Sequence, residues 1–457
     1  MTPHDDTIVA IATGAGRGAI AIVRLSGPAA YTVARRVATP FPAAPRVVSR
    51  GTVHAPDDPS RPIDHALITA FAGPASYTGE DAVEFAVHGG PLLGALVVEA
   101  CITAGARPAQ PGEFTERAVL HGKMDLVQAE AVADLIDARS RAAHRAALRQ
   151  LDGALSHRLA AMREMLLHVD ALLAYDIDFP EEDDAPPSLA RVLAACDDAL
   201  AQVDRLLATL PAAALGRDGA LVVLAGPPNA GKSALLNALV GEARVLVSDQ
   251  PGTTRDAVEV LVDDEPFPLR LVDTAGLRAS DDVLERMGIE VSERFVAQAH
   301  VVLACAETDA ALASTCAAVG ARTRGVVIAV RTKSDLHATA HDGAVEHPEQ
   351  TAQVAVSAVT GDGLAALRAA IRVAMKEQVA TPDDDTPVIT RARHEAALRR
   401  AGDELRAFRA AWAAGALPAP VAATHLRAAV TALESLIGAV DVEDVLERVF
   451  RTFCIGK

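Results

Sequence analysis

A glycine-rich segment that carries one lysine and one serine could hold phosphate groups. It reads Gly226-Pro-Pro-Asn-Ala-Gly-Lys-Ser233, and it lies between the apolar run Ala220–Ala225 and the helical stretch Ala234–Val240. Glycines let backbone N–H groups wrap phosphate oxygens, and the N-terminus of the following helix adds positive potential. The lysine can reach the β- and γ-phosphates, and the serine hydroxyl can ligate Mg²⁺. The segment is therefore predicted to be a P-loop.

Further polar elements follow apolar runs downstream, in the order that a guanine nucleotide site requires. Asp273-Thr-Ala-Gly276 would place its aspartate in the Mg²⁺ shell and the last N–H of the motif beside the γ-phosphate. Thr332-Lys-Ser-Asp335 ends in a carboxylate that can accept from both N1–H and N2–H of guanine, a donor pair that adenine lacks. Ser357-Ala358 is expected to cover the base from behind. Together these elements predict a protein that binds GTP in preference to ATP and hydrolyses it.

The nucleotide elements depart from the usual pattern at two positions. The base-reading segment usually begins with Asn, whereas this chain has Thr332. Leu277 follows Asp273-Thr-Ala-Gly276 at the position where Ras-like proteins have a glutamine that orients the attacking water. Because an apolar side chain cannot orient water, another group must supply that function. Pro251-Gly-Thr-Thr-Arg-Asp256 is predicted to be a switch segment in which a threonine hydroxyl closes on Mg²⁺.

The elements that must position these residues change character along the chain. Short apolar runs in residues 1–118 predict an α+β domain with mainly antiparallel strands. Residues 217–379 alternate strands with helices, which predicts a Ras-like α/β domain with a mostly parallel sheet. Residues 119–216 and 380–457 have helical spacing and are predicted to be two segments of one helical domain. The expected fold class is multidomain, α+β and α/β, with the P-loop domain inserted into the helical domain.

Composition narrows the class of protein. A chain of 457 residues is too long for one ordinary hydrophobic core, so two or three domains are expected. Its net charge of −17 argues against a surface covered with nonspecific nucleic-acid contacts. Five scattered cysteines without a CxxC pair exclude a disulfide framework and a zinc ribbon. No apolar run approaches the ~20 residues of a membrane helix, and the first residues lack the basic flank of a signal peptide. A cytoplasmic protein with no membrane contact is expected.

Arginines gather in two places, each of which is expected to be one helix. From charge alone, both clusters are interpreted as solvated helix faces rather than nucleic-acid-binding patches. The first cluster holds Arg139, Arg141, Arg145, Arg149, Arg158 and Arg163, and the second holds Arg391, Arg393, Arg399, Arg400, Arg406 and Arg409.

Short motifs outside the nucleotide site point to a known family. They are Asp6-Thr-Ile-Val-Ala10, Arg24-Leu-Ser-Gly27, Tyr77-Thr-Gly-Glu-Asp81, His88-Gly-Gly90, Pro111-Gly-Glu-Phe-Thr115, Lys123-Met-Asp-Leu126, Gln128-Ala-Glu-Ala131, Ile177-Asp-Phe-Pro180 and the terminal Phe453-Cys-Ile-Gly-Lys457. With these motifs, the chain resembles the MnmE/TrmE family of tRNA-modification GTPases over essentially its whole length.

The resemblance implies cofactors and partners. It implies a homodimer formed through the N-terminal domain and a tetrahydrofolate derivative, 5-formyl- or methylene-tetrahydrofolate, bound there. It implies an FAD-containing partner of the MnmG (GidA) type, with which the chain adds an aminomethyl-type group to C5 of the wobble uridine of certain tRNAs. It also implies hydrolysis that depends on Mg²⁺ and K⁺ and is activated when the G domains dimerise.

The resemblance also assigns residues to these sites. The folate positions are Arg24, Glu84, Lys123 and Lys457. Mg²⁺ would be held by Ser233 and Thr254, and K⁺ by Asn229, Ser248, Gln250 and Thr253. Glu285 would orient water through a second water, Lys232 would act on the phosphates, and Cys454 is a candidate nucleophile or polar neighbour in one-carbon transfer. The full GTP-binding set is Asn229, Ala230, Gly231, Lys232, Ser233, Ala234, Ser248, Thr253, Thr254, Asp273, Thr274, Ala275, Gly276, Thr332, Lys333, Asp335, Ser357 and Ala358.

A second function class is a GTP-gated switch for RNA or ribosome assembly that performs no modification chemistry. Switches of that class typically append an RNA-binding unit such as a KH domain with a GxxG loop. The flanks of this chain instead carry the folate-site residues and the Cys-Ile-Gly-Lys end, which favours the modification enzyme.

Overall fold

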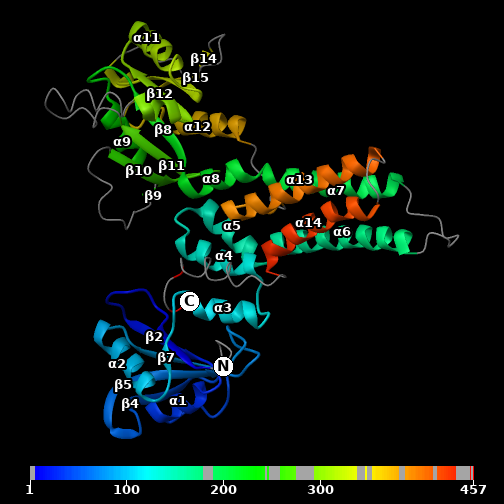
Figure 1. Ribbon diagram of the computed structural model, residues 1–457. Helices are drawn as coiled ribbons and strands as arrows, with labels where there is room; N and C mark the ends of the chain where they lie inside the picture. The colour runs from blue at the N-terminus through cyan, green and yellow to red at the C-terminus, as the bar shows by residue number, and fades with distance from the viewer. Residues whose placement is uncertain are drawn as a thin grey trace, which may run out of the picture. The chain divides into compact units, whose positions relative to one another are not determined.

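The computed structural model describes residues 6–178, 189–241, 244–245, 258–273, 293–336, 345–346, 352–379, 386–414, 419–438, 453 and 456 (Figure 1). The chain forms two compact units. Unit 1 comprises Met1–Ala133, Leu151–Leu167 and Arg427–Lys457, and unit 2 comprises Asp134–Gln150 and His168–Leu426.

Unit 1 is built on a seven-stranded sheet of order β3-β4-β5-β6-β2-β1-β7. The strands are β1 (Ile8–Ile11), β2 (Ile20–Ser26), β3 (Ala38–Thr39), β4 (Ser49–Ala55), β5 (Asp58–Phe71), β6 (Ala82–His88) and β7 (Arg107–Pro108). Neighbouring strands are antiparallel except for β1 and β7, which are parallel. The predicted α+β arrangement with mainly antiparallel strands is confirmed.

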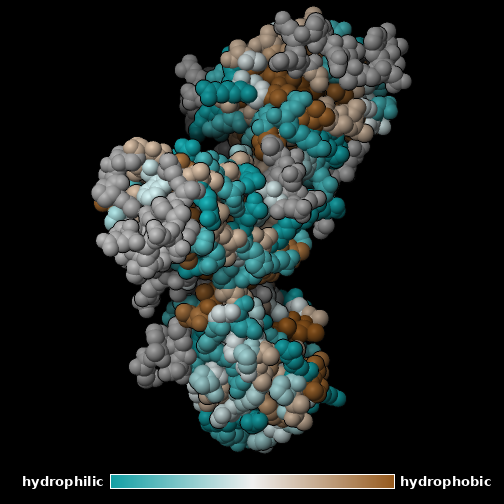
Figure 2. All heavy atoms as spheres, turned by 90° about the vertical axis from the view of Figure 1, so that its right-hand side faces the viewer, coloured by the Kyte–Doolittle hydropathy of each residue, from teal (hydrophilic) through white to brown (hydrophobic). Residues whose placement is uncertain are grey.

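The two faces of this sheet differ because side chains alternate along each strand. One face carries Val23, Leu25 and Phe85, which are fully buried under helices α1 (Ala30–Val37) and α2 (Pro91–Thr103). The opposite face carries Ile20, Ile22, Arg24, Glu84, Ala86 and His88 in cross-strand register. In Figure 2, brown hydrophobic patches lie between teal polar ones on the body that holds these strands.

Six helices lie between the last strand of the first sheet and the first strand of the second sheet in the described part of the chain. They are α3 (Glu113–Leu120), α4 (Leu126–Asp137), α5 (Arg141–Leu151), α6 (Ala154–Asp178), α7 (Leu189–Leu207) and α8 (Leu210–Asp218). After that sheet come α13 (Ala392–Ala414) and α14 (Ala419–Ile437). No helix within the described ranges is both long and apolar enough to cross a membrane.

The expectation that the first arginine cluster lies on a single helix is wrong. Helix α5 ends at Leu151 and α6 begins at Ala154, because Gly153 has a positive φ of 88° that breaks the helical path. Several arginines of both clusters form ion pairs, including Arg141 with Asp263 and Arg406 with Asp204.

Unit 2 holds an eight-stranded sheet of order β14-β15-β13-β12-β8-β11-β10-β9. The strands are β8 (Ala220–Ala225), β9 (Arg244–Val245), β10 (Val258–Asp263), β11 (Leu269–Asp273), β12 (Val301–Ala306), β13 (Val326–Arg331), β14 (Val345–Glu346) and β15 (Ala352–Ala355). The five central strands β15, β13, β12, β8 and β11 are mutually parallel. The predicted mostly parallel α/β sheet is confirmed.

Helices cover both faces of this sheet, which explains why β8 and β12 are continuous apolar runs. Helices α9 (Lys232–Gly241) and α12 (Leu364–Gln378) pack on the face that contains Val222 and Leu224. Helix α11 (Asp309–Gly320) packs on the other face, where Val319 joins Leu221 and Val223. The carboxyl ends of the parallel strands are therefore the place where polar loops can gather.

Candidate functional site: a P-loop nucleotide site and a second polar site

The predicted P-loop follows β8 and leads into α9. Gly226 is required there because a Cβ at this position would stand 2.1 Å from the carbonyl oxygen of Cys305. Asn229 has a φ of 63° and Gly231 a φ of 79°, so the loop turns through left-handed conformations that Asn and Gly tolerate best. Lys232 is 5% exposed, and its Nζ donates to the carbonyls of Gly226 (3.0 Å) and Pro227 (2.8 Å). The loop is thus curled around its lysine.

The two described residues expected near Mg²⁺ are brought together. Ser233 is in the first turn of α9, Asp273 is the last residue of β11, and the Ser233 Oγ donates to the Asp273 carboxylate. A hydroxyl and a carboxylate oxygen in contact are ligand types suited to a hard cation such as Mg²⁺. The donor set therefore fits the predicted ion.

The predicted base-reading elements also meet. The Ser357 Oγ donates to the Asp335 carboxylate (2.7 Å) and accepts from the backbone N–H groups of Val359 and Thr360. The Ser334 N–H donates to the Val356 carbonyl (3.1 Å). These contacts hold Asp335 at the carboxyl end of the parallel sheet, beside the loop that carries Ala358.

Thr332 and Lys333 lie against the P-loop. A Cβ on Gly231 would stand 3.7 Å from Thr332 Cβ and 3.9 Å from Lys333 Cε. The ammonium group of Lys333 forms an ion pair with Glu307, which directly follows β12. Glu307 was not among the predicted site residues. It directly follows β12, which is parallel to β13, and a polar residue at the carboxyl end of such a strand could have been predicted to lie near the site.

A second polar site lies on the open face of the N-terminal sheet. Arg24 and Glu84 are direct cross-strand partners on β2 and β6, and the guanidinium contacts the carboxylate at 2.8–2.9 Å. The Arg24 guanidinium also lies over the rings of Tyr77 and Phe114, at 5.3 and 5.7 Å from their centroids. Two of the expected folate residues are therefore brought together and fixed by aromatic neighbours.

Lys123 joins this region from another side. Its Nζ donates to the Pro74 carbonyl (2.9 Å), and its Cγ would be 3.4 Å from a Cβ on Gly79. Lys123 thus contacts the loop that contains Tyr77, but no contact joins it to Arg24 or Glu84 in the described part of the chain.

A buried charge network that the sequence did not reveal connects the N-terminal motifs. Arg117 is 0% exposed and its guanidinium pairs with Asp6, Glu80 and Glu113. Burial opposes the charge of Glu113, but hydrogen bonds from Arg107 and others leave its pKa lowered. The motifs that begin at Asp6, Tyr77 and Pro111 are therefore held together by one set of ion pairs.

Several expected site residues lie outside the described residues: Ser248, Gln250, Thr253, Thr254, Thr274, Ala275, Gly276, Glu285, Cys454 and Lys457. Near the chain's end, Phe453 packs with Leu126 and Ala129. Among the other cysteines, burial raises the pKa of Cys101 and of Cys305 to about 12, so neither is a thiolate nucleophile at neutral pH.

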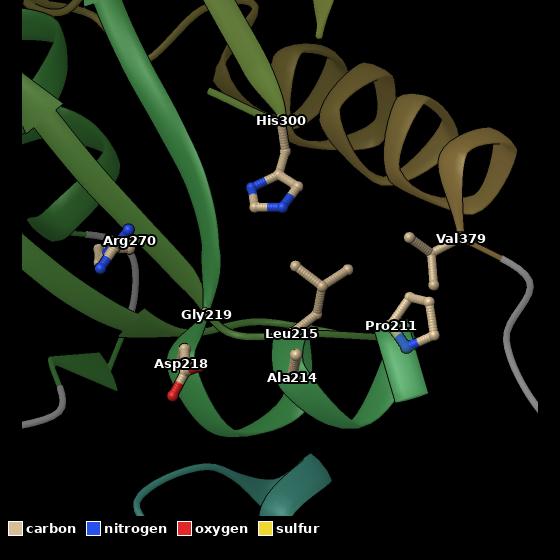
Figure 3. Close-up of a pocket in the computed structure, with 8 residues that line it drawn as sticks. All are labelled: Pro211, Ala214, Leu215, Asp218, Gly219, Arg270, His300 and Val379. Carbon is tan, nitrogen blue, oxygen red and sulfur yellow. The ribbon is translucent and has the colours of Figure 1, made fainter. Parts of the chain in front are cut away.

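A cavity of about 330 Å³ in unit 2 is separate from the nucleotide site. It lies where β8 and β12 begin, whereas the P-loop follows the end of β8. Figure 3 shows the His300 ring pointing toward Leu215, with Pro211 and Val379 beside it. The His300 Nδ1 accepts a hydrogen bond from the Leu221 N–H (3.0 Å), which ties β12 to β8.

Comparison with known proteins decides the family. Residues 7–123 match the family described as GTP-binding protein TrmE N-terminus, and residues 126–454 match the MnmE helical domain. The chain belongs to the MnmE family. A protein of Neisseria meningitidis serogroup A called tRNA modification GTPase MnmE is 40% identical over 100% of both chains. A protein of Methylobacterium radiotolerans with the same name is 43% identical over 99% of both.

Membership of the MnmE family confirms the expected resemblance and the expected GTPase. It also confirms an architecture with an N-terminal domain and a helical domain. The solved G domain of the T. maritima FeoB iron transporter is 24% identical and covers 34% of this chain and 97% of that chain, with a TM-score of 0.26. A TM-score this low supports no conclusion about this chain.

Proposed function

We propose that the chain hydrolyses GTP in unit 2 and couples hydrolysis to modification of C5 of the wobble uridine of certain tRNAs. The observation that carries this proposal is the meeting of two polar pairs at one end of a parallel sheet: Ser233 with Asp273, and Asp335 with Ser357. The first pair suits Mg²⁺ and phosphate, and the second suits guanine. The names of the relatives supply the tRNA part of the proposal.

In this proposal Lys232 binds the β/γ-phosphates and Ser233, together with Thr254, holds Mg²⁺, which neutralises charge on the phosphates when bound. Asn229, Ser248, Gln250 and Thr253 hold K⁺, and Glu285 orients the attacking water in place of the glutamine that Leu277 replaces. The remaining nucleotide contacts come from Ala230, Gly231, Ala234, Thr274, Ala275, Gly276 and Ala358.

The Arg24–Glu84 pair is proposed to bind a tetrahydrofolate derivative. The carboxylate suits the amino and ring N–H donors of a pterin, and Arg24, Lys123 and Lys457 suit an anionic glutamyl tail. The part-buried ion pair, at 17% and 26% side-chain exposure, supports a site that can exclude water around a ligand. Cys454 is proposed to lie beside the one-carbon group.

The proposal includes a homodimer formed through the N-terminal domain. The open sheet face supports it, because Ile20 is 58% and Leu67 is 48% exposed on strands whose other face is buried. It also includes an FAD-containing partner of the MnmG type, a cytoplasmic location, and the domain boundaries 1–118, 119–216, 217–379 and 380–457.

Mass spectrometry of tRNA wobble uridines tests the modification. Cells that lack this chain should lose the C5 substituent, and the wild-type chain should restore it. A chain with Lys232→Ala should fail to restore it, because the lysine that the P-loop encloses is removed. Unchanged uridines in the deleted cells would exclude modification and favour the GTP-gated RNA-binding switch.

A further inference from the structure

The base-reading segment is held against the P-loop without the asparagine that usually begins it. Thr332 is 3% exposed, and both its backbone N–H (2.9 Å) and its hydroxyl (3.2 Å) donate to the Ala306 carbonyl. The hydroxyl is therefore satisfied by the neighbouring strand β12. Within the described residues, Thr332 makes no hydrogen bond to the P-loop, whereas an asparagine amide has two N–H donors that could reach it.

Lys333 adds a second side chain against the P-loop, next to Thr332. Its side chain lies beside Gly231, and its backbone φ of 56° is a conformation that a non-glycine residue rarely adopts. A flexible four-carbon side chain needs a fixed end to remain in one place. The carboxylate of Glu307 provides that end through the ion pair with the Lys333 ammonium group.

We infer that Glu307 is a positioning residue for the guanine-binding segment. Its ion pair with Lys333 fixes the segment against Gly231 and replaces the hydrogen bonds that an asparagine at position 332 would make. This inference rests on the proposed function, in which Thr332–Asp335 reads guanine. Glu307 itself need not touch the nucleotide.

The neighbouring ion pair between Arg331 and Asp309 offers a matched control. Arg331 is the last residue of β13, and Asp309 is the first residue of α11, which follows β12. The Arg331 Nη1 lies 3.8 Å from the Asp309 carboxylate. The Asp309 side chain is 74% exposed, and among the described residues it contacts neither the P-loop nor Asp335. Loss of this carboxylate changes the local charge as much as loss of Glu307 without freeing Lys333.

The test measures dissociation of N-methylanthraniloyl-GDP from the full-length chain by stopped-flow fluorescence. KCl stays constant while choline chloride sets the ionic strength. Glu307→Gln should speed dissociation about two- to fivefold at low ionic strength, the range of a half-exposed ion pair, with the difference shrinking as salt screens the pair. Asp309→Asn should dissociate at the wild-type rate.

Rescue separates positioning from a general structural effect. Thr332→Asn in the Glu307→Gln chain should return the dissociation rate to the wild-type value, because the asparagine amide can donate a hydrogen bond to the P-loop. Wild-type dissociation from Glu307→Gln at low ionic strength, or failure of this rescue, would overturn the inference. Unaltered base preference in Asp335→Asn would instead overturn the proposed function on which it rests.

Discussion

Gly456 lies so close to Ile11 that no side chain fits between them. A Cβ at position 456 would stand 2.2 Å from the Ile11 carbonyl oxygen and 3.0 Å from the Ala12 Cα. The φ of Gly456 is 98°, which also favours glycine. Strand β1, which contains Ile11, pairs with β2, where Arg24 lies opposite Ala10. Gly456 is thus held next to the strand pair that carries Arg24 of the proposed one-carbon site.

Gly456→Ala should therefore move residue 456 away from Ile11. We expect this change to impair tRNA modification while GTP hydrolysis stays near the wild-type rate. Misplacement by about 1 Å can cost about 100-fold in rate, which sets the upper limit expected for the loss. Modified wobble uridine and released phosphate are both measured. Gly320→Ala is the control, since a Cβ at Gly320 meets nothing within 4 Å. Full modification by the Gly456 variant would remove the functional role of this contact.

Asp335→Asn should weaken GTP binding and shift the base preference toward xanthosine triphosphate. The amide donor suits the 2-oxo group of xanthine, whereas the carboxylate suits the N2–H of guanine. The Ser357 hydroxyl can still bond to the new side chain, so the loop should keep its place. Competition between GTP and xanthosine triphosphate for the purified chain gives the preference. An unchanged ratio would show that another residue reads the base.

GTP turnover should be faster in KCl than in NaCl at equal ionic strength, and Asn229→Gly should abolish the difference. Glycine is the better probe here because Asn229 has a φ of 63°, where alanine would add backbone strain. Gly therefore removes the proposed K⁺ ligand and keeps the shape of the loop. Equal rates of the wild-type chain in both salts would exclude K⁺ from the reaction.

Arg24→Gln should weaken binding of 5-formyltetrahydrofolate about 10- to 100-fold, the cost of one hydrogen bond to a charged group. Isothermal titration calorimetry on the full chain gives the affinity without need of catalysis. Arg36→Gln is the matched control, since Arg36 pairs with Asp57 elsewhere in the same unit. Equal losses in both variants would mean that Arg24 acts only through stability.

The character of both sheets could be predicted from the sequence, because the apolar pattern of a strand depends on which of its faces are buried. The run Ala220–Ala225 is continuous and both faces of β8 are covered, whereas β2 alternates and has one open face. The P-loop was predictable because its glycines and lysine are adjacent in the chain. Local patterns of this kind need no knowledge of distant contacts.

Contacts between distant residues could not be predicted in this way. Arg117 meets Asp6 and Glu80 across 111 and 37 residues, and nothing local to Arg117 indicates that it is buried. Likewise, Lys333 and Glu307 are 26 residues apart, and their pairing depends on the order of β12 and β13 in the sheet. In the same way, Gly153 separates α5 from α6, although the arginine cluster on both sides of it was predicted to be one helix.

The link between β12 and β8 should weaken in acid through His300. Burial, with a smaller contribution from the Arg270 charge, lowers the pKa of His300 below its usual 6.5. The unfolded chain therefore takes up a proton near pH 6.5 while the folded chain resists it. The stabilisation is complete above that pH, falls as the pH drops below it, and levels off once the folded form is also protonated.

The hydrogen bond also predicts a loss of stability in acid, because the His300 Nδ1 must be unprotonated to accept from the Leu221 N–H. Hydrogen–deuterium exchange of the β8 peptide, corrected for the intrinsic pH dependence, should rise between pH 7.5 and 5.5. In His300→Gln the amide oxygen can still accept that bond but does not titrate, so the corrected exchange should stay flat. His425, which pairs with Glu404 in another part of unit 2, provides the control as His425→Gln. If His425→Gln removes the acid effect and His300→Gln keeps it, the pH dependence has its origin away from the start of β8.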